Sequence, residues 1–232
     1  MIRTSSRAVG AALLGLGVAA GVAVATPAVS SAAPTVSSTT ATVSSTTATV
    51  PPAAESCVGT WDVVVGGLTN NTSVGFLNED QRVGYNSFDT RSGVRELDRL
   101  VRAHVRACPA DFIHAVGYSG GAAVVHQWAT ENGKEFRGKA GIVLIGDPKH
   151  PGGTGGVGGF AATDMRWVPT LGGANDDYGG LPALRVCNVQ LNGGDHICNS
   201  GVGWGGYLSG VHGDYDFDVN SYPVDADGVV LR

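Results

Sequence analysis

One segment of the sequence, Gly117-Tyr118-Ser119-Gly120-Gly121, has residue types and spacing that could support nucleophilic catalysis. It follows the pattern Gly-x-Ser-x-Gly, and it stands between an apolar run at 112–116 and an expected helix at 120–130. A sharp strand-to-helix turn exposes such a serine, and the flanking glycines leave room for the backbone to pack closely. The first amides of the helix point toward a developing oxyanion. The pattern therefore predicts a nucleophile elbow with Ser119 as the nucleophile.

A serine hydroxyl needs a general base to take its proton, and the sequence offers six histidines. After an elbow of this kind the acid and then the histidine follow in the chain. Three histidines lie on expected helices or strands, where a solvated or structural position is favoured: His104 (solvated), His114 and His126. His150 and His196 lie in downstream loops and remain candidates. His212 is favoured, because the base normally comes from the last loop.

The acid must lie between Ser119 and His212. The aspartates in this interval are Asp147, Asp164, Asp176, Asp177 and Asp195. Asp147 follows an apolar run and precedes a proline, which is also typical of a turn residue. Asp195 follows the last expected strand of this region and is favoured as the acid, with Asp147 second.

These residues need a scaffold that brings distant segments together. Short apolar runs, expected to be buried strands, occupy 61–66, 82–87, 112–116, 140–145 and 184–189. Amphipathic or apolar helices are expected at 92–107 and 120–130. Apolar strands that alternate with helices predict a mostly parallel central sheet covered on both faces. Residues 151–213 are glycine-rich and are expected to be mostly loops with one strand.

The chain has 232 residues, a formal net charge of −5 and 43% hydrophobic residues, which suits one globular domain and argues against nucleic-acid binding. Residues 1–33 combine arginines, an apolar run and small residues, as a secretory signal peptide does; a retained membrane anchor is the alternative. Residues 34–56 are rich in Ser, Thr, Ala and Pro and form an expected disordered linker. The folded domain is expected at 57–232. Its four cysteines predict two disulfides in an exported protein, with three pairings possible.

Several segments resemble cutinases and the related cutinase-like and PE-PPE-domain hydrolases of mycolic-acid actinobacteria. The similar segments cover most of the expected domain, at 107–109, 115–122, 143–148, 187–198 and 212–215. The resemblance implies an α/β-hydrolase fold and a triad of Ser119, Asp195 and His212. It also implies that Asp147 is structural, and that Cys57 pairs with Cys108 and Cys187 with Cys198. The expected domain shows no apolar insertion large enough for a lid domain, so we expect a compact hydrolase without a lid.

Two positions depart from the pattern of that family. The family usually has Gln after the serine, where this chain has Gly120. Its first strand usually ends in Gly followed by Ser or Thr, whereas here Leu68 follows Gly67 and precedes Thr69. The oxyanion hole is therefore expected to use the amides of Gly120 and Leu68, with Thr69 as the alternative to Leu68.

The sequence thus predicts a secreted serine esterase that cleaves carboxylic esters with short or medium acyl chains through an acyl-enzyme. Two alternatives stay open: an acyltransferase that uses the same triad on cell-envelope glycolipids, and a surface binding module without catalysis. No cofactor or metal is expected, since the acidic run at 214–218 lacks the glycine and glutamate of a calcium loop. We expect a monomer with a lipid or other ester substrate, located outside the cell or in the cell wall, with possible association with the envelope.

Overall fold

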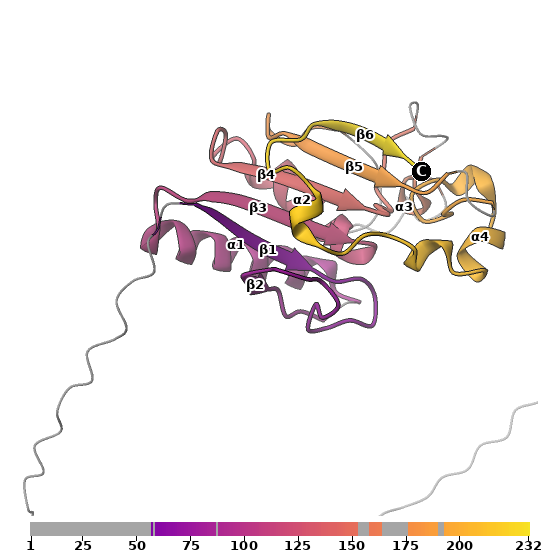
Figure 1. The fold of residues 1–232 in the computed structure, drawn as a ribbon, viewed down its shortest axis with the longest axis horizontal. Helices are drawn as coiled ribbons and strands as arrows, with labels where there is room; N and C mark the ends of the chain where they lie inside the picture. Colours follow the sequence, from indigo (N-terminus) through magenta and orange to yellow (C-terminus); the bar gives the residue numbers. More distant parts are fainter. Residues whose placement is uncertain (1–56, 58, 87, 153–157, 164–175, 190–192) are drawn as a thin grey trace, which may run out of the picture. The chain divides into compact units, whose positions relative to one another are not determined.

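The computed structural model describes residues 57, 59–86, 88–152, 158–163, 176–189 and 193–232. The expected signal peptide and linker lie outside these residues. Strands within the described chain form one parallel sheet in the order β2-β1-β3-β4-β5-β6 (Figure 1). The strands span Thr60–Val65 (β1), Gln81–Arg82 (β2), Phe112–Tyr118 (β3), Ala140–Ile145 (β4), Ala183–Cys187 (β5) and Gly228–Leu231 (β6). The predicted α/β class is confirmed, and every strand pairing in this sheet is parallel.

Two long helices and several short ones accompany the sheet. The helices are α1 (Thr90–Ala107), α2 (Gly120–Asn132), α3 (Phe160–Thr163) and α4 (Gly205–Leu208), with 3-10 turns η1 (Ser200–Val202), η2 (Val211–Gly213) and η3 (Val219–Ser221). Helix α1 starts where the Asp89 carboxylate accepts a hydrogen bond from the Ser92 amide at 3.1 Å. None of the described helices combines the length and the apolar character that a membrane crossing requires.

The strands bury side chains on both faces, as the apolar runs predict. In β4, Ile142 and Leu144 pack in the core cluster that includes residues of α1 and α2. Val143 and Ile145 alternate with them and pack on the opposite face, against aromatic side chains of the C-terminal segment such as Tyr222. The sheet is thereby fixed between two apolar layers, which gives the carboxyl ends of its strands a rigid position.

The carboxyl ends of the central strands lie level with one another. Val65 of β1 pairs with Gly117 of β3, and Tyr118 pairs with Ile145 of β4. The chain leaves each of these strands at the same edge of the sheet, so the loops that follow can meet there. This edge carries Ser119, the residue directly after β3.

Two expected strands are shorter than the sequence suggests, and one strand was not expected. The strand expected at 82–87 is only Gln81–Arg82, because the chain turns away after Val83 and the amide of Tyr85 bonds the carbonyl of Asn71 instead. The strand expected at 184–189 ends at Cys187, where Asn188 begins the loop. Strand β6 was not anticipated; it pairs with β5 across about 40 residues of sequence, a contact without a local signal.

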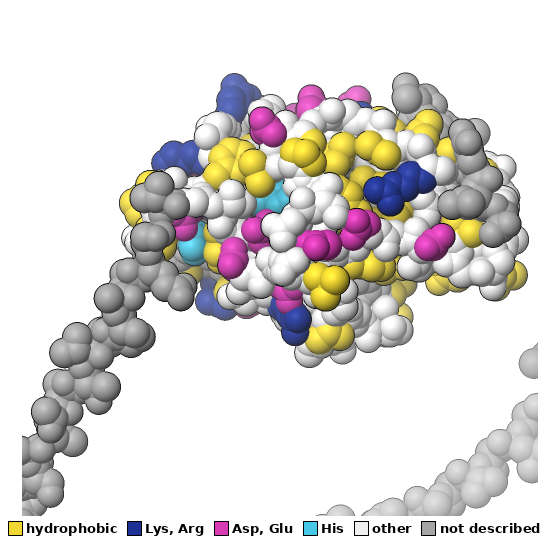
Figure 2. All heavy atoms as spheres, in the orientation of Figure 1, with side chains coloured by type: hydrophobic (Ala, Val, Ile, Leu, Met, Phe, Trp, Pro, Cys, Tyr) yellow, Lys and Arg dark blue, Asp and Glu magenta, His cyan; other side chains and the backbone are white. Residues whose placement is uncertain are grey.

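The surface view matches the acidic composition. On the face drawn in Figure 2, acidic side chains gather across the middle while Lys and Arg are scattered, with apolar side chains between them. This face does not present the continuous basic patch that a phosphate backbone requires.

Two disulfides lie in the described part of the chain, Cys57–Cys108 and Cys187–Cys198. The first bridge joins the segment before β1 to the end of α1 and closes a loop with a sequence separation of 51. Chain entropy in the unfolded state makes such a closure worth about 4 kcal/mol. It lies at the amino end of the sheet, away from Ser119.

We expect the variant Cys57→Ser/Cys108→Ser to melt on the order of 10 °C lower while it retains ester turnover at low temperature. The other bridge is the matched control: its loop has a separation of only 11, so its removal should lower the melting temperature less and reduce kcat more. Calorimetry and kinetics on both double variants test this. Equal melting temperatures for the wild type and the first variant would contradict it.

Candidate active site

The turn at Ser119 has the strained geometry of a nucleophile elbow. Ser119 adopts φ +56° and ψ −121°, a conformation that residues other than glycine rarely take, and its amide donates to the carbonyl of Ile145 at 2.8 Å. Helix α2 begins at the next residue. A Cβ on Gly117 would lie 2.5 Å from the carbonyl oxygen of Gly121, and a Cβ on Gly121 would lie 2.0 Å from that of Val65. The two glycines of the motif are therefore required by close backbone packing.

The structure brings Ser119, His212 and Asp195 into one hydrogen-bonded chain. His212 Nε2 lies 2.8 Å from Ser119 Oγ, and His212 Nδ1 lies 2.8 Å from Asp195 Oδ2. Ser119 and His212 are each 8% exposed, and Asp195 is fully buried. An imidazole held in this way can take the serine proton at Nε2 while the carboxylate stabilises the imidazolium.

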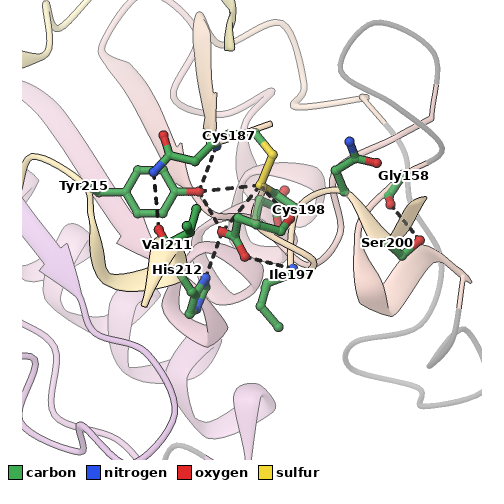
Figure 3. The surroundings of a disulfide bond; sticks show 12 residues. Gly158, Cys187, Ile197, Cys198, Ser200, Val211, His212 and Tyr215 are labelled. Atoms are coloured by element: carbon green, nitrogen blue, oxygen red, sulfur yellow. Dashed lines mark hydrogen bonds and ion pairs between the residues drawn. A yellow bond between two sulfur atoms is a disulfide. The ribbon is translucent and has the colours of Figure 1, made fainter. Parts of the chain in front are cut away.

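The Asp195 carboxylate has further donors around it (Figure 3). Tyr215 Oη donates to Oδ2 at 2.6 Å, and the amide of Ile197 donates to Oδ1 at 2.9 Å. These bonds offset the cost of burying a charged group. Burial, and then the charge of Asp195, raises the pKa of Tyr215 well above its usual value. Tyr215 therefore stays protonated, and remains a donor, at neutral and moderately alkaline pH.

Asn188, directly after β5, connects the loop of the acid to the loop of the histidine. Its amide N–H donates to Tyr215 Oη at 3.1 Å, and its carbonyl accepts from the amide of Asp195 at 2.5 Å. Its side-chain Nδ2 donates to the carbonyls of Val211 and Asp214, which flank His212, at 3.3 and 2.9 Å. Neither Asn188 nor the role of Tyr215 was predicted from the sequence, where the only signal is a polar residue at the end of a buried strand.

The Cys187–Cys198 disulfide lies directly against the acid. Cys198 Sγ is 3.6 Å from Asp195 Oδ2 and 3.6 Å from Tyr215 Oη, as Figure 3 shows. The bridge joins the end of β5 to the residue three positions after Asp195. The disulfide therefore ties the segment that carries Asp195 to the end of β5.

Two tyrosine rings flank the imidazole of His212. The ring of Tyr118 lies 5.0 Å from it at an interplanar angle of 28°, and the ring of Tyr207 lies 5.2 Å from it at 33°. Tyr118 also donates its hydroxyl to the carbonyl of His212 at 2.7 Å. The tyrosines thus restrict both the plane of the imidazole and the backbone that carries it.

Gly120 and Leu68, the expected oxyanion donors, lie next to each other. A Cβ on Gly120 would be 3.4 Å from the backbone nitrogen and from the side chain of Leu68. A Cβ on Gly67 would be 3.0 Å from Cβ of Ser119, so the loop after β1 passes directly over the elbow. Thr69, the alternative donor, follows with φ +68°. Leu68 and Gly120 therefore lie against each other beside the elbow, and their use as oxyanion donors stays a prediction.

The other candidates for base and acid lie elsewhere. Asp147 accepts a hydrogen bond from His126 at 2.6 Å, and both side chains are buried beneath the sheet edge. Burial alone would raise the pKa of Asp147, but the charge of His126 and hydrogen bonds from His126 and the Lys149 amide hold it below its usual value. His196 packs with its ring 4.0 Å from that of Trp204.

Several further candidates occupy structural positions or fall outside the structure. His150 is buried, and its backbone carbonyl accepts from the amide of Gly159. Asp177 accepts from the amide of Gly179, and Asp176 is exposed. Asp164 lies outside the described residues.

The two early histidines pair with aspartates at the amino end of the sheet. His114 Nδ1 lies 2.6 Å from Asp62 Oδ1. His104, expected to be solvated, is instead half-buried: it stacks on Trp61 at 4.2 Å and contacts Asp111 at 2.9 Å. Among the described residues, His104, Cys108 and Asp111 are the one group close enough to suggest metal ligation. Cys108 is in a disulfide, so it has no thiolate to offer.

Comparisons with known proteins were made against families, curated proteins and solved structures. The family model described as Cutinase matches residues 32–220. A solved structure described as a novel cutinase-like protein from Cryptococcus sp. is similar at 18% identity, with a TM-score of 0.45; the match covers 65% of this chain and 84% of that one. The comparison with curated proteins gives no match.

Replacement of Gly120 by alanine and replacement of Gly121 by alanine should affect stability and activity differently. We expect Gly121→Ala to lower the melting temperature and to reduce ester turnover more than about tenfold, because its Cβ would overlap the carbonyl of Val65. Gly120→Ala should keep most of the activity, because its Cβ makes only ordinary contacts with Leu68. Thermal melts and ester assays measure both effects, and an equal response of the two variants would refute the steric explanation.

Removal of the Tyr215 hydroxyl should impair the proposed triad and leave substrate binding unaffected, because this hydroxyl bonds Asp195. A buried acceptor that loses its donor costs about 1–3 kcal/mol, so Tyr215→Phe should reduce kcat about tenfold or more. The loss should appear in kcat and leave KM nearly unchanged, because the Tyr215 hydroxyl bonds the Asp195 carboxylate. Tyr222→Phe is the control, since that hydroxyl bonds the Asp216 carbonyl instead. An unchanged kcat in Tyr215→Phe, or a loss that appears in KM alone, would contradict this role.

Proposed function

The chain belongs to the cutinase family, and from this premise we propose that Ser119, His212 and Asp195 are the catalytic triad of a secreted esterase. Members of this family are carboxylic ester hydrolases of the α/β-hydrolase fold, so the chain is a serine esterase by membership. The assignment of the three residues rests on one observation above all. The hydrogen bonds from Ser119 to His212 and from His212 to Asp195 form an unbroken chain of two 2.8 Å contacts.

The proposed reaction begins when His212 Nε2 takes the proton of Ser119 as Oγ attacks the ester carbonyl carbon. Asp195 stabilises the imidazolium, and the amides of Leu68 and Gly120 donate to the oxyanion of the tetrahedral intermediate. The proton passes from Nε2 to the alkoxide oxygen as the ester C–O bond breaks, and the alcohol leaves. Water then attacks the acyl-enzyme with His212 again as the base.

We propose esters with short or medium acyl chains as substrates, bound at an open site. Exposed apolar side chains beside the triad support this: Leu68 lies against Gly120, and Tyr207 lies on the imidazole of His212. Helix α4, which carries Tyr207, has only four residues, and the neighbouring η1 and η2 have three each. Elements of this size, within the described residues, are too short to form a helical lid domain.

We also propose that residues 1–33 are a signal peptide and that 34–56 form a linker, which places the catalytic domain outside the cell or in its wall. Two disulfides fit an oxidising compartment, and cutinases are typically secreted proteins. The cleavage position and any attachment to the envelope are parts of this proposal that require mass spectrometry of the exported protein.

The test of the function uses an organophosphonate and an ester assay on the same preparations. The wild type should gain one covalent adduct and hydrolyse esters, whereas Ser119→Ala should gain none and lose turnover by a factor on the order of 10⁴ or more. Ser221→Ala, an exposed serine that bonds Asp216, is the matched control and should behave as the wild type.

Two results would contradict the proposal. Retention of more than about a tenth of the activity by Ser119→Ala would remove this serine from the mechanism. A dominant acyl-sugar product when a sugar acceptor such as trehalose accompanies an activated ester would identify a transferase instead of a hydrolase.

A further inference from the structure

A small apolar cavity lies beside the triad, between the loop after β1 and the segment that follows His212. It has a volume of about 300 Å³, and its lining includes Asn70, Val74, Phe76, Tyr118, Gly213 and Phe217. Two lining residues are sequence neighbours of the proposed triad, since Tyr118 precedes Ser119 and Gly213 follows His212. Tyr118 also contacts His212 through its ring, at 5.0 Å, and through its hydroxyl, so the cavity lies next to the proposed base.

The aromatic lining of the cavity is firmly packed. The ring of Phe217 meets that of Tyr118 edge to face at 4.9 Å and that of Phe76 at 5.6 Å. The hydroxyl of Tyr118 is fixed by its bond to the carbonyl of His212. A cavity with walls held in this way keeps its shape, so it can select a ligand by size.

Hydrogen bonds also fix the rim of the cavity. The side chain of Asn70 donates to the carbonyl of Val74 at 2.6 Å and accepts from the amide of Val74 at 3.1 Å. These two bonds fix the backbone of Val74, whose side chain is 52% exposed. Val74 thus stands between the cavity and solvent, where a change of side-chain size alters access without disturbing the core.

The chemistry of ester cleavage places the two parts of the substrate differently. The alkoxide must take its proton from His212 Nε2, so the alcohol part lies beside the imidazole. The ring of Tyr118, which lines the cavity, lies 5.0 Å from that imidazole, and Tyr207 of α4 contacts the same imidazole at 5.2 Å, next to exposed Trp204 and Leu208. The α4 side is open surface, which can follow a chain of any length, whereas the cavity admits only a compact group.

Building on the proposed function, we propose that this cavity is a subsite for the alcohol part of the ester, and that it takes a compact apolar alcohol of about the size of a benzyl or cyclohexyl group. The acyl chain then lies along α4. Val74 and Phe217 are the residues that set the size of the alcohol.

The test compares two ester series on the full chain. One series keeps the butanoyl group and varies the alcohol through methyl, butyl, cyclohexyl and benzyl; the other keeps a methyl alcohol and varies the acyl chain from two to eight carbons. The constant kcat/KM reports acylation, the step in which the alcohol is still bound. Deacylation of the common butanoyl-enzyme is independent of the alcohol.

We expect Val74→Trp to lower kcat/KM for the benzyl and cyclohexyl esters about tenfold relative to the methyl ester, and to leave the acyl-chain profile unchanged. Val74→Ala, which widens the mouth, should favour the bulkier alcohols instead. Leu77→Trp is the matched control, because Leu77 is 60% exposed on the same loop and does not line the cavity. It should reproduce the wild-type profiles.

Two outcomes would overturn the subsite. A change in the acyl-chain profile in place of the alcohol profile would assign the cavity to the acyl group, and unchanged profiles in both tryptophan variants would remove it from substrate binding. Failure of the proposed function appears differently: the wild type would then turn over no ester of either series, or only as fast as Ser119→Ala.

Discussion

The close approach of helix α2 to strands β1 and β3 is the constraint on which the rest of the site depends. It leaves no space for a side chain at Gly121, whose Cβ would overlap the carbonyl of Val65. Because the helix begins immediately after β3, Ser119 is forced to φ +56°, and the surrounding sheet and helix maintain that strain. The same approach puts Gly120 against Leu68 and directs Ser119 Oγ toward His212.

The other two members of the proposed triad are positioned by a different kind of interaction. Asp195 and His212 stand in segments with only short helical turns, where ordering the backbone costs conformational entropy. Hydrogen bonds of Asn188 and Tyr215 and the Cys187–Cys198 bridge offset that cost. The nucleophile therefore depends on packing of regular elements, and the acid and base depend on a buried polar network. A substitution in the network can impair catalysis while the sheet remains intact.

The sequence was informative where structure is local and silent where it depends on distant contacts. Apolar runs and helical periodicity located β3, β4, α1 and α2 within a few residues, and with them the elbow. Strand β6 and the shortness of β2 follow from pairing across the fold, which leaves no local pattern. His104 was expected to be solvated because it lies on a helix rich in charged residues. Its stacking on Trp61 of β1 is a contact between distant segments and cannot be recognised from the helix alone. The side chain of Asn188 bonds carbonyls 23 and 26 residues further along the chain, so its role is visible only in three dimensions.

Two buried His–Asp pairs in this fold show why a pair alone does not identify a catalytic base. His126 and Asp147 lie 2.6 Å apart, slightly closer than His212 and Asp195 at 2.8 Å, and the sequence left Asp147 as the second candidate for the acid. Their difference lies at the second ring nitrogen. Within the described residues, His126 Nε2 has no hydrogen-bond partner and is enclosed by the core, whereas His212 Nε2 meets a strained serine at the edge of the sheet. Proton transfer requires a group that can give and receive the proton, so only the His212 pair can act on an ester. The pair at Asp147 instead provides a buried hydrogen bond that joins α2 to the residue two positions after β4, and in this way it supports the helix whose approach creates the elbow.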